Sequence, residues 1–136
     1  MMVSTKGRYA LRILADLAQL PDGEFASIKD IADKQGISLK YLEAITSILL
    51  KAELVESKRG RSGGYRLLKT PENYSLLTIF KLTEGTISPV NCLDHDEVIC
   101  GREEHCIAYP LWVKMNDVLE DYLSKVTLAD LLSGNL

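Results

Sequence analysis

The sequence predicts a mainly α-helical fold with one small β-hairpin, and three observations lead to this prediction. Two short helical patterns meet at Gly36, and a basic, glycine-rich stretch follows at residues 57–66. A long apolar stripe begins after Pro110. Two helices joined by a tight turn and followed by a two-stranded ribbon form a winged helix-turn-helix, and the stripe predicts a long C-terminal helix behind it.

Helix-capping residues define the first two helices. Ser4 or Thr5 can accept hydrogen bonds from the free N–H groups of a first helix, which we expect to end before the Pro-Asp-Gly turn at residues 21–23. Ser27, with Asp30 three residues later, resembles a capping box for a second helix. Both helices are therefore predicted from their caps and their apolar spacing.

The third helix is the candidate recognition helix. It follows Gly36, which ends the second helix, and it is capped by Ser38. Its apolar residues repeat at helical spacing and are expected to pack inside: Leu39, Leu42, Ile45 and Leu49. The residues left on or near the outer face are small or polar: Lys40, Tyr41, Glu43, Ala44 and Ser47. A face of this kind can lie in the major groove of DNA.

Four residues of this segment are candidate DNA contacts. Ser38, Lys40 and Tyr41 lie near the helix N-terminus, where free N–H groups and the helix dipole favour a phosphate. Glu43 can accept a hydrogen bond from cytosine N4 in the major groove. A solvated helix charge is the alternative interpretation of Glu43.

The β-hairpin is predicted by its glycines. Residues 54–55 and 65–68 read as two strands, and Gly60, Gly63 and Gly64 permit the positive φ angles that the bend between them needs. The hairpin would form the wing of the helix-turn-helix.

Two arginines, Arg59 and Arg61, lie at the predicted tip of this wing. They are placed to enter a minor groove, where narrow A·T-rich segments focus negative potential. An exposed basic turn is the alternative for any single arginine. We favour DNA binding because the hairpin directly follows a capped pair of helices.

The two halves of the chain carry opposite charge. The 136 residues have a net charge of −3, but residues 1–69 hold 12 Lys and Arg against 8 Asp and Glu (+4), and residues 70–136 hold 4 against 11 (−7). Phosphate neutralisation depends on local charge, so the N-terminal half is expected to meet DNA. The chain has no signal-type apolar run and no segment of roughly 20 apolar residues, which predicts a cytoplasmic protein without a membrane span.

The C-terminal half is expected to contain three helices. Ser75 caps one that Gly85 stops, Pro110 suits the first turn of a long one, and Thr127 with Asp130 caps a short terminal one. The long helix carries this apolar stripe: Leu111, Trp112, Met115, Val118, Leu119, Tyr122, Leu123 and Val126. The stripe is too wide for a solvated surface helix, so we expect it to bind a partner.

Three cysteines lie in a loop without helical periodicity. We divide the chain into a winged helix-turn-helix domain at residues 1–85, this loop at 86–109, and a dimerisation helix with a short terminal helix at 110–136. An odd number of cysteines without a secretory signal fits poorly with disulfides, which favours metal or redox chemistry.

The cysteine spacing favours an iron-sulfur cluster over zinc. Seven residues separate Cys92 from Cys100 and five separate Cys100 from Cys106, which is long for a zinc ribbon or finger. Several soft thiolates on one loop suit an iron-sulfur cluster, with zinc as the second choice and ordinary free thiols as the alternative. His95 and His105 lie in the same loop, as candidate ligands or as solvent-exposed side chains.

Several short motifs together resemble the IscR, NsrR and CymR family of bacterial winged helix-turn-helix transcription regulators. The motifs are STKGRYALR at residues 4–12, IA at 31–32, QGISL at 35–39, YLE at 41–43, LV at 54–55, RG at 59–60, GGY at 63–65 and TLADL at 127–131. Each is weak alone, but their order and spacing are highly specific. The resemblance covers essentially the whole chain.

This resemblance implies a homodimer that binds palindromic operator DNA and pairs through the long C-terminal helix. In the cluster-binding branches three loop cysteines hold iron, and the matching positions are Cys92, Cys100 and Cys106. Two departures leave the fourth ligand unassigned, because Tyr109 stands where IscR-like proteins have a histidine and Arg8 where NsrR-like proteins have an aspartate.

Three hypotheses about function follow. The first is a dimeric DNA-binding regulator that senses cluster, iron or redox status through a loop-bound cluster of the [2Fe-2S] type. The second keeps DNA binding without a metal, acting by thiol oxidation or by binding a partner enzyme of cysteine metabolism, since residues 84–90 look like the CymR branch. The third is a small cysteine- or zinc-dependent enzyme, which the lack of a recognisable catalytic motif disfavours.

Overall fold

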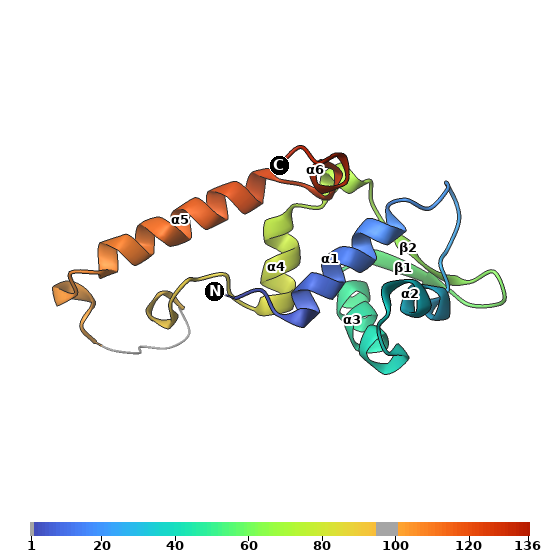
Figure 1. Cartoon of the computed structure of the whole chain (residues 1–136), viewed down its shortest axis with the longest axis horizontal. Coiled ribbons are helices and arrows are strands. Elements are labelled where there is room, and N and C mark those ends of the chain that lie inside the picture. Colours follow the sequence, from blue (N-terminus) through green and yellow to red (C-terminus); the bar gives the residue numbers. More distant parts are fainter. Residues whose placement is uncertain (1, 95–100) are drawn as a thin grey trace.

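The computed structural model describes residues 2–94 and 101–136 and is mainly helical with one antiparallel hairpin (Figure 1). The elements, in chain order, are α1 (Thr5–Leu17), α2 (Ile28–Gln35), α3 (Leu39–Lys51), β1 (Val55–Lys58), β2 (Gly64–Leu67), η1 (Pro71–Asn73), α4 (Leu76–Glu84), η2 (Asn91–Leu93), η3 (Glu103–His105), α5 (Tyr109–Lys125) and α6 (Leu128–Ser133). The predicted winged helix-turn-helix with a long C-terminal helix is confirmed.

The predicted caps account for where these helices begin. The hydroxyls of Ser4, Ser27, Ser38 and Ser75 each accept a hydrogen bond from the backbone N–H three residues later. Thr127 forms a full capping box, in which its own N–H also donates to the side chain three residues on. Each cap satisfies N–H groups that have no partner within the helix, so the sequence fixes these boundaries locally.

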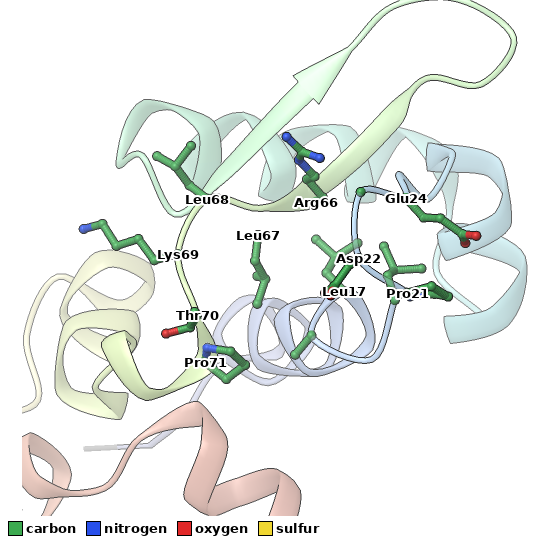
Figure 2. Close-up of a pocket in the computed structure, with 13 residues that line it drawn as sticks. Leu17, Pro21, Asp22, Glu24, Arg66, Leu67, Leu68, Lys69, Thr70 and Pro71 are labelled. Atoms are coloured by element: carbon green, nitrogen blue, oxygen red, sulfur yellow. The ribbon is translucent and has the colours of Figure 1, made fainter.

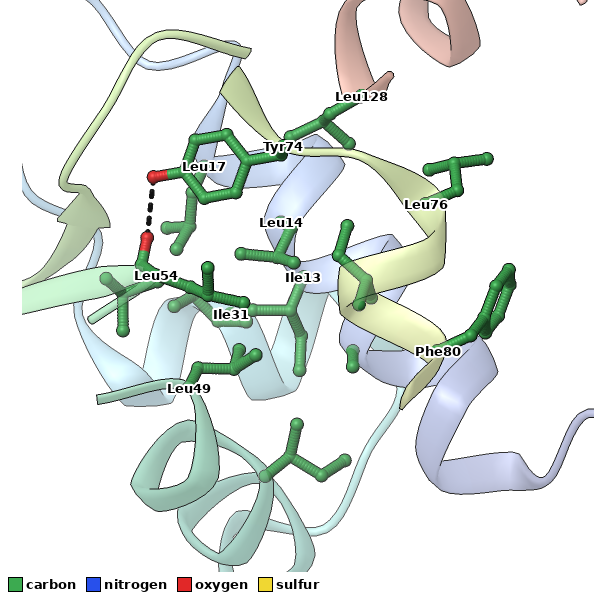
Figure 3. Packing of buried hydrophobic residues seen from close by; sticks show 14 of the residues in the cluster. Ile13, Leu14, Leu17, Ile31, Leu49, Leu54, Tyr74, Leu76, Phe80 and Leu128 are labelled. Carbon is green, nitrogen blue, oxygen red and sulfur yellow. Dashed lines mark hydrogen bonds between the residues drawn. The ribbon is translucent and has the colours of Figure 1, made fainter. Parts of the chain in front are cut away.

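A single hydrophobic core surrounds α1. Ile13 and Leu14 of this helix are completely buried, and α1 packs against α2, α3 and α4. Tyr74 lies in the same core, where its hydroxyl donates to the Leu54 carbonyl at 2.7 Å and accepts from the Lys69 N–H at 2.9 Å (Figure 3). The buried ring thereby joins the base of the hairpin to the helical body, and its burial raises the pKa of Tyr74.

The hairpin is held to the body by a close approach of two backbones. Its strands pair from Val55 with Leu67 to Lys58 with Gly64, so the first strand extends beyond the predicted residues 54–55. Ala26, in the loop before α2, pairs with β2 through two hydrogen bonds of 2.8 and 2.9 Å to Tyr65. A Cβ atom at Gly64 would lie 2.0 Å from the Ala26 carbonyl oxygen, so only glycine fits there.

The long helix α5 leaves the body as an arm (Figure 1). Its C-terminal end is buried against the body at Leu123 and Val126, and Leu76 N–H of α4 donates to the Val126 carbonyl at 2.9 Å. Lys81 of α4 forms an ion pair with Glu120 at 2.9 Å. The N-terminal end of α5 lies far from α1, α2, α3 and the hairpin (Figure 1).

The prediction that Leu39 packs inside is wrong, because its side chain is 46% exposed. Leu39 is the first residue of α3, immediately after the Ser38 cap. The inward positions at this end are filled by Ile37, just before the cap, and by Leu42. Leu39 therefore turns to the edge of the outer face.

Candidate DNA-binding surface

The turn between α2 and α3 is fixed by backbone geometry and by one arginine. Gly36 adopts a left-handed conformation with φ +64°, and its N–H donates to the Ala32 carbonyl. Arg12 of α1 donates to the side-chain and main-chain oxygens of Gln35, each at 2.9 Å. The guanidinium thus satisfies a carbonyl at the C-terminus of α2 and holds the helix-turn-helix against α1.

Three of the four predicted contact residues at the N-terminal end of α3 lie on its exposed outer surface. Ser38, Lys40 and Glu43 are all solvent-exposed. Tyr41 is instead half-buried, and its ring packs edge-on against Tyr9 of α1 with the ring centroids 5.8 Å apart. Tyr41 therefore lies at the border of this surface, where it also links the recognition helix to α1.

The wing presents two free cations at its tip, whereas neighbouring groups hold Arg66 in β2. Arg59 and Arg61 are exposed, and neither has an ion-pair partner within the described part of the chain. Arg66 pairs with Glu56, and its guanidinium lies over the Phe25 ring at 4.5 Å from the centroid. The tip arginines are thus the ones available to a ligand.

Phe25 is a functional residue that sequence reasoning missed. Its ring contacts both Arg66 and Lys58, whose ammonium lies 5.7 Å from the ring centroid. A cation over an aromatic face is attracted by the ring quadrupole, so Phe25 braces the wing against the loop before α2. The signal that marks it is a single aromatic residue in an otherwise polar turn. Nothing comparable marks Arg12, whose partner Gln35 is 23 residues away.

The cysteine loop is only partly described. Cys92 and Cys106 are half-buried free thiols, whereas Cys100 and His95 lie outside the described residues. His105 is exposed, and Tyr109 opens α5. The described residues contain no group of three or more His, Cys, Asp or Glu side chains that could hold a metal ion. The two described thiols are nevertheless soft donors, of the kind that an iron-sulfur cluster takes.

A shallow hollow of about 330 Å³ lies between the end of α1, the following loop and β2 (Figure 2). Its charged lining is mixed, with Asp22 and Glu24 on one side and Arg66 and Lys69 on the other. Because the lining favours neither anions nor cations, we assign it no ligand.

None of the described helices is both long and apolar enough to cross a bilayer.

The sequence model of the Rrf2 family, described as an iron-dependent transcriptional regulator, matches residues 3–134. The chain belongs to the Rrf2 family. This membership places it among DNA-binding transcriptional regulators of the winged helix-turn-helix type, and not among enzymes. The predicted resemblance is confirmed.

The Rrf2 relatives include two kinds of regulator at comparable similarity. The transcriptional regulator IscR of Vibrio vulnificus is 34% identical over 135 residues, which cover 99% of this chain and 79% of IscR. The structure of CymR, the global cysteine regulator of Bacillus subtilis, matches with a TM-score of 0.78 at 38% identity, over 98% of this chain and 97% of CymR. The oxidized form of Staphylococcus aureus CymR matches with a TM-score of 0.77 at 35% identity, over 97% and 96%.

We predict that replacing Phe25 by leucine loosens the wing without unfolding the Rrf2 domain. Leucine keeps an apolar side chain but removes the ring face, so about 0.5–1 kcal/mol should be lost for each of the two cation contacts. Urea unfolding measures the loss, and hydrogen exchange at the Tyr65 N–H, which bonds to Ala26, should accelerate. The matched control Phe25→Tyr retains the ring and should behave as the wild type. A Phe25→Leu variant with unchanged stability and exchange would contradict the bracing role.

Proposed function

We propose that this Rrf2 regulator binds palindromic operator DNA as a homodimer, with α3 in the major groove and the wing in the adjoining minor groove. The observation that carries the proposal is the pair of exposed tip arginines without an ion-pair partner, Arg59 and Arg61, together with an exposed polar face on α3. The neighbouring cations Lys58 and Arg66 are engaged with Phe25. The regulator would act in the cytoplasm, where chromosomal DNA lies.

Each contact residue has a role that follows from its position. Ser38 and Lys40, at the N-terminus of α3, would position a phosphate, with Tyr41 at the border of the same site. Glu43, one turn further along, would accept from cytosine N4. Arg59 and Arg61 would insert into a narrow minor groove, where the negative potential is strongest.

Replacing Arg59 and Arg61 together by alanine should weaken operator binding and reduce its dependence on salt. Each lost phosphate contact lowers the slope of log K against log salt by about 0.9, so the double variant should lose about one to two units of slope. Fluorescence anisotropy over a salt series measures both quantities. Arg102→Ala, which removes an exposed arginine of the cysteine loop, is the control. An unchanged slope in the double variant would reject the wing as a DNA contact.

The homodimer is proposed from one face of α5. Leu111, Met115, Val118 and Tyr122 are spaced by four, three and four residues and are 41–56% exposed. This is the heptad spacing of helices that pack against each other in solution. Leu119 packs against the core, and Leu123 and Val126 are buried in it, whereas the seam faces solvent and is free to pack against a second copy.

Replacing Met115 and Val118 together by glutamate should convert the dimer to a monomer. Two charges in the centre of the seam would have to be desolvated between the paired helices. Sedimentation velocity measures the oligomeric state, and circular dichroism checks that the helices remain. Ser124→Glu, on the other side of the same helix, should leave the dimer intact. If the seam variant stays dimeric while folded, the partner surface lies elsewhere.

We further propose that Cys92, Cys100 and Cys106 hold an iron-sulfur cluster of the [2Fe-2S] type. Thiolate chemistry supports this, as does the similarity to IscR. When bound, such a group supplies sensitivity to iron and oxidants. The site adjoins α5, which is tied to the body by Lys81–Glu120 and by the bond from Ser88 Oγ to Asn116 Oδ1 at 3.2 Å. A change at the thiols can therefore reach the DNA-binding half through α4.

A second candidate keeps DNA binding and omits the metal. The chain is as similar to CymR proteins as to IscR, and one of the matching CymR structures is of an oxidized form. In this alternative the loop thiols respond by reversible oxidation, or the regulator binds a partner enzyme of cysteine metabolism.

Anaerobic purification should decide between the two candidates. The cluster predicts visible absorbance with stoichiometric iron and sulfide, and loss of all three signals when any of the cysteines is replaced by serine. His105→Ala, an exposed residue of the same loop, tests whether that side chain is a ligand. Wild-type protein without iron or sulfide would overturn the cluster, and reversible loss of operator binding on mild oxidation would then favour the thiol switch.

A further inference from the structure

Leu39 is the one large apolar side chain of α3 that is left in solvent. It is 46% exposed, and within residues 3–67, all of which the structure describes, every other large hydrophobic side chain is more covered. Leucine is among the residue types most often buried. The core does not need Leu39 in this position, because Ile37 and Leu42 anchor this end of α3.

The neighbours of Leu39 place it on the surface proposed to enter DNA. It is the first residue of α3, between the exposed residues Ser38 and Lys40. Residues four apart share a face of a helix, so Leu39 lies one turn before Glu43 on the same side. An apolar group therefore interrupts an otherwise polar edge at the end of the recognition helix.

We propose that Leu39 is a specificity-determining residue that contacts the 5-methyl group of a thymine. This inference rests on the proposed placement of α3 in the major groove. The thymine methyl is the apolar group that base pairs present in the major groove, where the other readable groups are hydrogen-bond donors and acceptors. Contact with it removes apolar surface of both partners from water. A polar base edge or a phosphate offers Leu39 no comparable gain.

The spacing on the helix limits where this thymine lies. Four residues span about 6 Å along a helix axis, and successive bases of a strand are about 3.4 Å apart. The thymine contacted by Leu39 therefore lies within about two base steps of the base contacted by Glu43. In the major groove, Leu39 would contact the methyl group of one base, and Glu43 would contact the amino group of a neighbouring base.

Removing the methyl group alone tests the proposal. The wild-type full-length dimer first selects a duplex from a random-sequence pool, and each thymine of that duplex is then replaced singly by deoxyuridine. At one thymine in each half-site the replacement should weaken wild-type binding about three- to tenfold, as expected for loss of one buried methyl contact. Leu39→Ala should weaken binding to the unmodified duplex by a similar factor, and should be insensitive to deoxyuridine at that position.

The control is Leu68→Ala, which shortens another leucine of nearly equal exposure, 44%, outside α3. It should bind as the wild type and keep the full sensitivity to deoxyuridine. Because Leu39 is outside the core, its alanine variant should unfold at the wild-type temperature, which a thermal melt checks. Three results would each overturn the contact. The first is that Leu39→Ala binds with wild-type affinity, and the second is that the effects of Leu39→Ala and of deoxyuridine are independent at every thymine. The third is a selected site that has no thymine beneath α3. If the wild type selects no duplex at all, the proposed function itself fails, and the contact with it.

Discussion

The burial of α1 is the constraint on which the rest of the molecule depends. Ile13 and Leu14 of α1 are fully buried, and α1 packs against α2, α3 and α4. This one helix therefore positions the turn between α2 and α3, the recognition helix α3, and α4, which supports α5. The polar side of the same helix continues this role, since Arg12 holds the end of α2 and Tyr9 packs on Tyr41. A shift of α1 would therefore displace the whole candidate DNA-binding surface, and not one contact within it.

Features encoded by local chemistry were predictable from the sequence. A serine before an apolar-periodic segment and a glycine after it define each helix through groups only a few residues apart, so Ser27, Ser38 and Gly36 could be assigned without a structure. The glycine-rich hairpin and the stripe of α5 were identified by the same kind of local pattern. The family resemblance rests on these features taken together.

Features that depend on distant partners were not predictable. The side chain of Leu39 is exposed because Ile37 and Leu42 fill the inner positions at this end of α3. Helical periodicity alone does not reveal which residues fill these positions. Phe25 acquires its role only when β1 and β2 place Lys58 and Arg66 over its ring. Of the candidate metal site, the sequence supplies thiols but not their mutual geometry, because spacing along a loop does not determine distances in space.

The approach of Gly64 to the Ala26 carbonyl divides the wing into two zones with different freedom to vary. Where β2 begins, the main chains of Gly64 and Ala26 meet so closely that any side chain at Gly64 would force them apart. At the tip, Arg59 to Ser62 project into solvent and are limited only by the turn itself. Under the proposed function, substitutions at the tip can change which DNA the hairpin contacts while Gly64 is retained, so operator preference can change without rebuilding the domain.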